Sequence, residues 1–337
     1  MSSLAEVARH AGVSKATASR ALSGAAHVSD ATRARVAASA AELGFVASTS
    51  AASLVTGRTR NVGVVTPFIS RWFFGEVIEG IEEALIDAGY DLSLFRVQED
   101  PDLRQRVFDY FLVRKRVDAV ITVCVALSPE EIRALAALGK PVVGIGGGIA
   151  GMSSLRIDDV AASRLATEHL LSLGHQRILH VGGDQEERMD FHVHAQRLAG
   201  FRQAMATAGH RPGDDFAAAT EFTIAGGFAT GLRVLGNPAT RPSAIVAASD
   251  EVAIGVILAA RQLGIQVPRD LSVVGIDDHD LAEMFGLTTV RQVPRAQGRD
   301  AVGMIMASID AREITSHDLQ LPLTLRVRSS TSAPQPD

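Results

Sequence analysis

The chain has 337 residues, which is too many for one ordinary domain and enough for two or three. Its composition, 47% hydrophobic and 21% charged, is that of a globular protein and excludes a disordered or fibrous one. No run of about eighteen apolar residues occurs, and the N-terminus lacks a secretory signal pattern, so we expect a cytoplasmic protein without membrane association. Cys124 is the single cysteine, which excludes an internal disulfide and fits a reducing compartment.

Charge is distributed unevenly along the chain. Residues 1–60 carry seven basic and three acidic side chains, a net of +4, although the whole chain carries −5. A small basic head on an acidic body is expected where the head binds a polyanion such as nucleic acid. Chance also produces a basic excess of this size, so charge alone does not decide whether residues 1–60 bind nucleic acid.

The first 45 residues predict three short helices. Apolar residues recur at helical spacing over residues 4–11, and Gly12 ends that helix. Ser14 is placed to cap a second helix over residues 15–22, and a third helix begins after Ser29. The tight turn between the first two helices predicts a helix-turn-helix unit.

In such a unit the second helix enters the major groove of DNA. Arg20 can pair with the two acceptors of guanine, Lys15 can reach guanine or phosphate, and the short hydroxyl side chains suit phosphate oxygens. The alternative is a small helical hairpin with a solvated charged face. The residues predicted to contact DNA in this head are Ser14, Lys15, Ala16, Thr17, Ser19, Arg20, His27 and Thr32.

Residues 46–60 consist mainly of small side chains and predict a linker with marginal helix propensity. From Asn61 onward, strand and helix patterns alternate, and the alternation restarts around residues 158–176. This predicts an α/β fold of two doubly wound halves, with a ligand cleft at the carboxyl ends of the strands. Strands are expected at 62–66, 91–97, 118–123, 141–145, 178–181, 244–248 and 272–276, and helices near 74–88, 100–115, 129–138, 160–173, 194–208, 225–235 and 251–263.

Residues 4–24 read Leu-Ala-Glu-Val-Ala-Arg-His-Ala-Gly-Val-Ser-Lys-Ala-Thr-Ala-Ser-Arg-Ala-Leu-Ser-Gly and resemble the headpiece of the LacI/GalR family of bacterial transcriptional regulators. Residues 28–33 and 42–45 continue the match. The body resembles the periplasmic-binding-protein-like core of the same family at residues 173–178, 181–183, 197–201, 247–255, 267–278, 287–292 and 326–331. The resemblance therefore covers nearly the whole chain.

The resemblance implies a homodimeric repressor whose affinity for a near-palindromic, double-stranded operator is controlled by a small carbohydrate-like effector. It also implies that Leu54, in a hinge helix, wedges between base steps in the minor groove. A passive linker is the alternative. The implied domains are a headpiece at 1–45, a hinge at 46–60 and an effector-binding and dimerisation core at 61–331. The core would comprise subdomains at about 61–157 with 288–318 and about 158–287 with 319–331, followed by a disordered tail at 332–337.

The family's effector contacts, carried over position by position, fall on Phe73, Phe74, Arg197, Phe222, Ser249, Asp277 and Gln292, and Asp190 is added because of its place in a loop. Aromatic faces would stack on a sugar ring, and Arg197 and Asp277 would bind hydroxyls. Alternatively, Arg197 forms a surface ion pair and Phe74 belongs to the core. This sequence departs from the family at Arg71-Trp72, at the glycines of residues 146–148 and at Ser249, which alters the sugar contacts on one side.

Other chemistries have weaker support. Residues 146–151 match G-x-G-x-x-G, but no helix start follows them, so we expect no dinucleotide cofactor. His192 and His194 lack acidic or cysteine partners at metal spacing, so we interpret them as ordinary loop histidines and expect no metal. No catalytic motif appears, so we expect no enzyme. A solute-binding transport component and an enzyme on a doubly wound fold remain the alternative functions.

Overall fold

The computed structural model describes residues 2–22, 28–45, 58–97, 100–108, 117–183, 193–210, 216–311 and 316–335. The chain divides into two units, of which the first comprises Met1–Asn61 with Arg116–Asp118 and the second the remainder. Across these described residues, no helix combines the length and the apolarity needed to cross a membrane.

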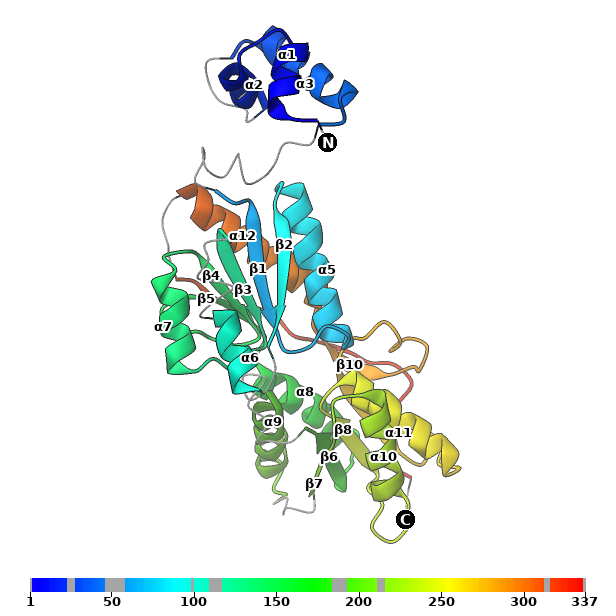
Figure 1. Ribbon diagram of the computed structural model, residues 1–337. Coiled ribbons are helices and arrows are strands. Elements are labelled where there is room, and N and C mark those ends of the chain that lie inside the picture. The colour runs from blue at the N-terminus through cyan, green and yellow to red at the C-terminus, as the bar shows by residue number, and fades with distance from the viewer. Residues whose placement is uncertain are drawn as a thin grey trace. The chain divides into compact units, whose positions relative to one another are not determined.

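The first unit holds three short helices, α1 (Leu4–His10), α2 (Lys15–Leu22) and α3 (Asp30–Glu42), as the sequence predicts (Figure 1). The expected caps are present, because the Oγ of Ser14 accepts the Thr17 N–H at 3.1 Å and the Oγ of Ser29 accepts the Thr32 N–H at 3.3 Å. Small apolar side chains form the core of this unit, namely Val7, Ala8, Ala11, Ala18, Ala21, Val36 and Ala40.

The second unit contains two six-stranded sheets. The strand order of the first sheet is β11-β5-β4-β3-β1-β2, with β1 Asn61–Thr66, β2 Asp91–Arg96, β3 Ala119–Val123, β4 Val142–Ile145, β5 Ser153–Arg156 and β11 Asp318–Gln320. The order of the second is β12-β10-β9-β8-β6-β7, with β6 Ile178–Gly182, β7 Ala217–Ala219, β8 Ala244–Ala247, β9 Ser272–Asp277, β10 Thr288–Arg291 and β12 Thr324–Arg326. The central pairs are parallel, whereas β12 runs antiparallel to β10.

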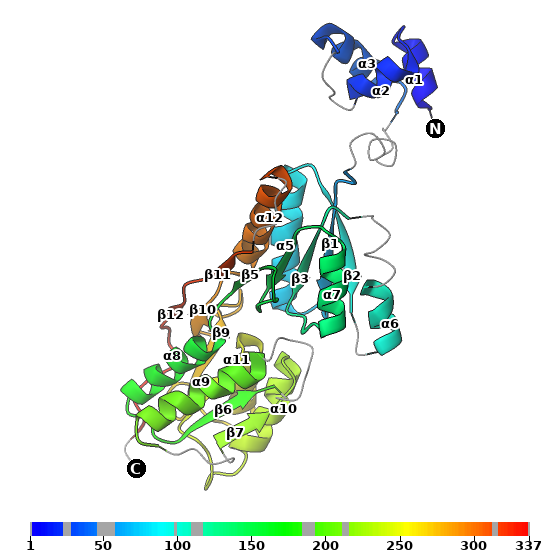
Figure 2. The ribbon, with the colours of Figure 1, turned by 90° about the vertical axis from the view of Figure 1, so that its left-hand side faces the viewer.

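Helices cover both faces of each sheet, which makes each half doubly wound (Figure 2). The first sheet lies between α5 (Trp72–Asp87) with α12 (Pro294–Ala311) and α6 (Pro101–Arg106) with α7 (Pro129–Ala137). The second lies between α8 (Asp159–Ser172) with α9 (Val193–Thr207) and α10 (Ile224–Leu235) with α11 (Asp250–Gln262). The central strands are buried along nearly their whole length, so their sequences read as mainly apolar runs.

Helix α12 was not among the expected helices, and it packs against α5 at very close range. A Cβ atom at Gly80 would collide with the Arg295 carbonyl, and one at Gly298 would collide with the Val77 carbonyl. Both glycines therefore serve helix packing. Interior glycines such as Gly298 also weaken helix propensity, which explains why the sequence pattern did not predict this helix.

The structure corrects two expected boundaries. Strand β10 pairs with β9 in the second sheet, so the chain returns to the first subdomain after Arg291 and not at about residue 288. Strand β11 pairs with β5 in the first sheet, so the final crossing follows Gln320 and not residue 318. These short strands lie at or near sheet edges, where a pattern of three or four residues carries little periodic signal.

The tail expected to be disordered from residue 332 is instead bound to the core at its start. The Ser332 N–H donates to Ser272 Oγ at 3.0 Å, and the Ser332 carbonyl accepts from that hydroxyl at 3.1 Å. The His175 ring also lies 2.9 Å from this carbonyl. These hydrogen bonds therefore hold Ser332 in place.

Candidate functional site

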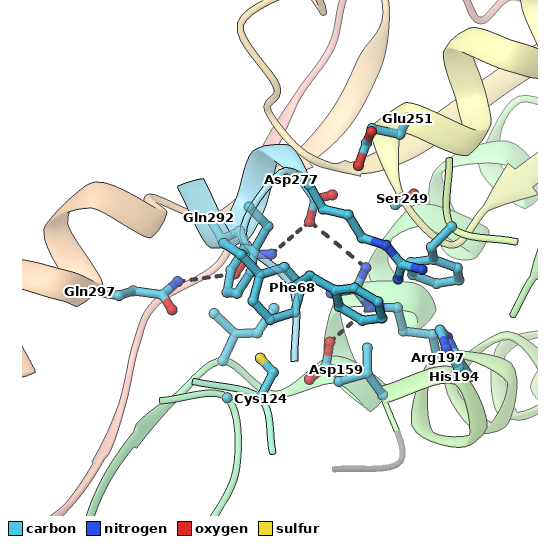
Figure 3. A pocket seen from close by; sticks show the side chains of 17 residues that line it. Phe68, Cys124, Asp159, His194, Arg197, Ser249, Glu251, Asp277, Gln292 and Gln297 are labelled. Carbon is cyan, nitrogen blue, oxygen red and sulfur yellow. Dashed lines mark hydrogen bonds and ion pairs between the residues drawn. The ribbon is translucent and has the colours of Figure 1, made fainter. Parts of the chain in front are cut away.

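A pocket lies where the carboxyl ends of strands from the two sheets meet (Figure 3). Its lining residues are Phe68, Arg71, Phe73, Phe74, Cys124, Gly146, Ile157, Asp159, Val193, His194, Arg197, Phe222, Ser249, Glu251, Asp277, Gln292 and Gln297. Seven of the eight residues expected from the resemblance line it, namely Phe73, Phe74, Arg197, Phe222, Ser249, Asp277 and Gln292. Asp190 lies outside the described residues.

Arg197 is at the centre of the polar side of the pocket. It projects from α9 with only 5% of its surface exposed, so it is not a surface ion pair. Its Nε donates to Asp159 Oδ1 at 2.8 Å, and its Nη1 donates to the Ala248 carbonyl and lies 3.8 Å from Asp277 Oδ1. These contacts fix the guanidinium plane, as binding of a hydroxylated ligand by a planar donor requires.

A chain of hydrogen bonds continues from Asp277 toward the other subdomain. Gln292 Nε2 donates to Asp277 Oδ1 at 2.6 Å, and Gln297 Nε2 donates to Gln292 Oε1 at 3.0 Å. Asp277 ends β9 with a φ of 136°, a conformation that side chains other than glycine rarely adopt. Gln297 belongs to α12, so the chain links a strand end of the second sheet to a helix of the first subdomain.

Carboxylates beside this network have raised pKa values. Burial raises the pKa of Asp277, and the nearby Arg197 partly opposes that shift. Burial and the neighbouring Asp277 raise the pKa of Asp250, whose carboxylate accepts from the Thr289 hydroxyl at 2.7 Å and the His279 N–H at 2.8 Å. Burial, followed by the Asp277 charge, raises the pKa of Glu251 to about 7.

Aromatic rings form the apolar side of the pocket. The ring of Phe74 makes edge-to-face contacts with Phe68 and Phe73, each with centroids 5.4 Å apart. Phe74 also packs in the core under the first sheet, so the expectations that it is a core residue and that it lines the pocket are both met. On the opposite side, His194 and Phe222 are in contact with centroids 4.2 Å apart.

Several lining residues were not anticipated. Asp159 begins α8 and holds Arg197, and Cys124 follows β3 directly. The expected end of a strand at residue 123 was a usable signal for Cys124, because ligands in such folds bind at strand ends. His194 was interpreted as an ordinary loop histidine, and this was wrong, because it lies in the first turn of α9, is buried and lines the pocket. His192 lies outside the described residues.

The glycine segment that matches the dinucleotide pattern leads into β5 and not into a helix, so it lacks the helix N-terminus that binds a pyrophosphate. Among the residues that the structure places, no group of three or more His, Cys, Asp or Glu side chains is arranged to hold a metal ion.

The first unit presents α2 as a candidate nucleic-acid interface. Ala18 and Ala21 face its core, whereas Ser14, Lys15, Ala16 and Arg20 are exposed and Thr17 and Ser19 are half-buried. Thr32 is also half-buried, with its hydroxyl 2.9 Å from Ser29 Oγ. His27, Leu54 and the remainder of the segment 46–57 lie outside the described residues.

Asp118 fixes the backbone that follows this segment. Its carboxylate accepts the N–H groups of Thr59 at 2.9 Å and Arg60 at 2.8 Å. Asp118 is 5% exposed, and its own N–H donates to the Asn61 carbonyl at 2.7 Å. Arg60 has a φ of 51°, a left-handed conformation that these bonds help to hold.

Comparisons with protein families agree at both ends of the chain. Residues 3–48 match the family described as bacterial regulatory proteins, lacI family, and residues 167–331 match a periplasmic binding protein-like domain. The HTH-type transcriptional regulator DegA of Bacillus subtilis (strain 168) is 33% identical, with 97% of each chain covered. The ribose operon repressor of Escherichia coli (strain K12) is 31% identical, with 98% of this chain and 100% of the repressor covered.

Solved structures show the same relationship. The lac repressor dimer bound to operator and the anti-inducer ONPF has a TM-score of 0.86 and 26% identity, covering 98% of this chain and 99% of that one. The complex of the transcriptional regulator CelR with cellobiose has a TM-score of 0.71 and 28% identity, covering 98% of this chain and 100% of that one.

Proposed function

The chain belongs to the LacI family of bacterial regulatory proteins, and on that premise we propose that it is a transcriptional repressor whose operator affinity is set by a small carbohydrate. The observation that supports this most strongly is the combination, in one chain, of an exposed basic helix α2 and a buried pocket centred on Arg197. Its relatives are regulators and not enzymes. We place its action in the cytoplasm, where its operator would be.

For operator recognition, we propose that a homodimer places one α2 in the major groove of each half-site. Arg20 and Lys15 would contact bases or phosphates, and Ala16 would contact a thymine methyl group. The hydroxyls of Ser14, Thr17, Ser19 and Thr32, together with His27, would contact the backbone. Leu54 from each protomer would wedge between base steps at the operator centre.

For effector recognition, we propose that the sugar ring lies between the aromatic rings and binds the polar groups around Arg197. Phe73, Phe74 and Phe222 would supply apolar faces, and Asp277 and Gln292 would bind hydroxyls. Asp190 remains a proposed contact. The Oγ of Ser249 accepts the Val252 N–H at 3.3 Å as the cap of α11, so Ser249 would act mainly by positioning that helix.

The two sites would be linked through the relative positions of the two subdomains. An effector that binds one arrangement more tightly than the other shifts operator affinity by that difference and by no more. Gln297 and Gln292 connect the subdomains beside the pocket and would sense its occupant.

A footprinting experiment tests the operator half of this proposal. The full-length protein should protect a near-palindromic site upstream of its own gene, with two half-sites one helical turn apart. Arg20→Ala should abolish this protection. Uniform protection without a preferred site would contradict sequence-specific repression and would favour a solute-binding role for the same core.

A further inference from the structure

The part of the pocket formed by the first subdomain has an apolar floor. Cys124 follows β3, Gly146 follows β4 and Ile157 follows β5, so all three stand at carboxyl ends of strands. A Cβ atom at Gly146 would overlap the Cys124 Sγ, and Gly146 has a φ of 89°. The thiol therefore packs directly on the glycine backbone, and no larger side chain fits there.

The backbone N–H groups of Cys124 and Gly146 are already used within the sheet. The Cys124 N–H donates to the Ile145 carbonyl at 2.8 Å, and the Gly146 N–H donates to the Leu155 carbonyl at 2.9 Å. The Cys124 thiol is a weak donor and a weak acceptor. A ligand hydroxyl placed against this floor would therefore exchange strong hydrogen bonds with water for weak ones.

The first subdomain also contributes two polar side chains to the lining, Arg71 and Gln297. The Arg71 guanidinium lies 3.5 Å from the centroid of the Phe68 ring, and Gln297 donates to Gln292. The carboxylates that line the pocket, Asp159, Glu251 and Asp277, and the buried Arg197 come from the second subdomain. The buried ionic network of the pocket is thus centred in the second subdomain, whereas the strand ends of the first subdomain present an apolar floor.

We infer that the effector is a 6-deoxy monosaccharide, in which a methyl group replaces the exocyclic hydroxymethyl group. This inference rests on the proposed function and names its ligand class. The ring hydroxyls bind Arg197, Asp277 and Gln292, and the methyl group lies against Cys124 and Ile157. A cavity of about 80 Å³ has room for one small ring, since a single water needs about 10–15 Å³.

Matched pairs of sugars test this inference by isothermal titration calorimetry on the full-length protein. Each pair differs only in the hydroxyl on carbon 6: L-fucose and L-galactose, D-fucose and D-galactose, L-rhamnose and L-mannose, and 6-deoxy-D-glucose and D-glucose. In the pair with the correct ring stereochemistry, the deoxy sugar should bind at least about tenfold more tightly than the hydroxymethyl sugar. The hydroxymethyl sugar binds less tightly because it buries a hydroxyl that forms only weak hydrogen bonds with the floor.

A substitution of the floor provides a second readout. Cys124→Ser adds a hydroxyl at nearly constant volume and should reduce the preference for the methyl sugar, whereas Cys124→Ala adds no polar group and should retain that preference.

Equal or tighter binding of the hydroxymethyl sugar by the parent protein overturns the inference and leaves the proposed function intact. If no sugar of either type binds, the inference and the carbohydrate part of the proposed function both fail, and operator binding remains as the separate test of the repressor.

Discussion

The indole ring of Trp72 stacks on the imidazole ring of His279, with centroids 4.5 Å apart and an interplanar angle of 28°. Trp72 Nε1 also donates to Asp280 Oδ2 at 3.1 Å. Trp72 begins α5 in the first subdomain, whereas His279 and Asp280 follow β9 in the second. The two subdomains are therefore joined beside the pocket by a contact that involves no ligand.

Removal of this contact should weaken effector binding. In Trp72→Ala the subdomains lose a stacked pair, so the effector must supply the free energy that holds them together. Such pairs contribute about 0.5–1.5 kcal/mol, so we expect a Kd roughly 3–10 times higher, measured by calorimetry. Trp72→Phe keeps a stacking ring, so its effector Kd should lie between those of Trp72→Ala and the parent protein. Identical affinities for all three proteins would show that the contact does not stabilise the bound arrangement.

Replacement of Arg197 should separate sensing from DNA binding. Arg197→Lys keeps the positive charge beside Asp159 but loses the planar donor fork that also reaches the Ala248 carbonyl. We expect effector affinity to fall by about 100-fold, as the loss of charged hydrogen bonds predicts, while operator affinity without effector stays similar. The conservative change is preferred because Arg197→Ala would leave Asp159 as a buried, unpaired charge. An unchanged effector response in a folded Arg197→Lys protein would refute the assignment of this pocket.

The Asp118 carboxylate should be needed for operator binding and not for effector binding. Asp118→Ala removes the acceptor of the Thr59 and Arg60 N–H groups and so frees the backbone just before β1, which follows the proposed hinge residue Leu54 in the chain. Two lost charge-assisted hydrogen bonds predict operator binding weakened by about tenfold or more. Asp118→Asn retains one acceptor oxygen and should therefore lose less operator affinity than Asp118→Ala. Equal losses of operator and effector affinity would indicate general misfolding and contradict a specific role of Asp118 in holding residues 59 and 60.

Glu251 should give stability a measurable pH dependence. Burial raises its pKa to about 7 from its ordinary value of 4.5, so the folded state keeps the proton at a pH where the unfolded state has lost it. Glu251 therefore destabilises the fold increasingly as pH rises from about 4.5 to 7, and the full cost remains above that range. Glu251→Gln should raise Tm at pH 8 by about 2–4 °C, which is ~1 kcal/mol after allowance for partial exposure, and should change it little at pH 4.5. A Tm difference that is the same at both pH values would contradict this assignment.

Much of the architecture follows from local pattern. The α/β alternation, the helix-turn-helix unit and the strand end that carries Asp277 into the pocket depend on periodicity, caps and the rule that ligands bind at carboxyl ends of strands. Helix α12 and strand β10 depend on tertiary packing instead. Gly298 weakens helix propensity locally but permits the close approach to Val77, which no local pattern reveals.

The composition of the pocket was only partly predictable for the same reason. Cys124 and Gly146 become neighbours because β3 and β4 pair in register, and Asp159 meets Arg197 because α8 packs against α9. Each of these contacts joins segments that are separated in sequence. The family resemblance supplied positions such as Phe222, whereas the apolar floor is a property of this chain that emerges when its strand ends are assembled.

The most direct test is the fluorescence anisotropy of a labelled operator from upstream of the gene, titrated with the full-length protein at one fixed salt concentration, with and without each sugar. Salt is held constant because phosphate contacts make DNA affinity strongly salt-dependent. We expect tight, sequence-specific binding, and one sugar should shift the operator Kd by about 5–150-fold, the range typical of coupling between two sites. Absence of specific operator binding, or tight binding that no small ligand shifts, would contradict a ligand-controlled repressor.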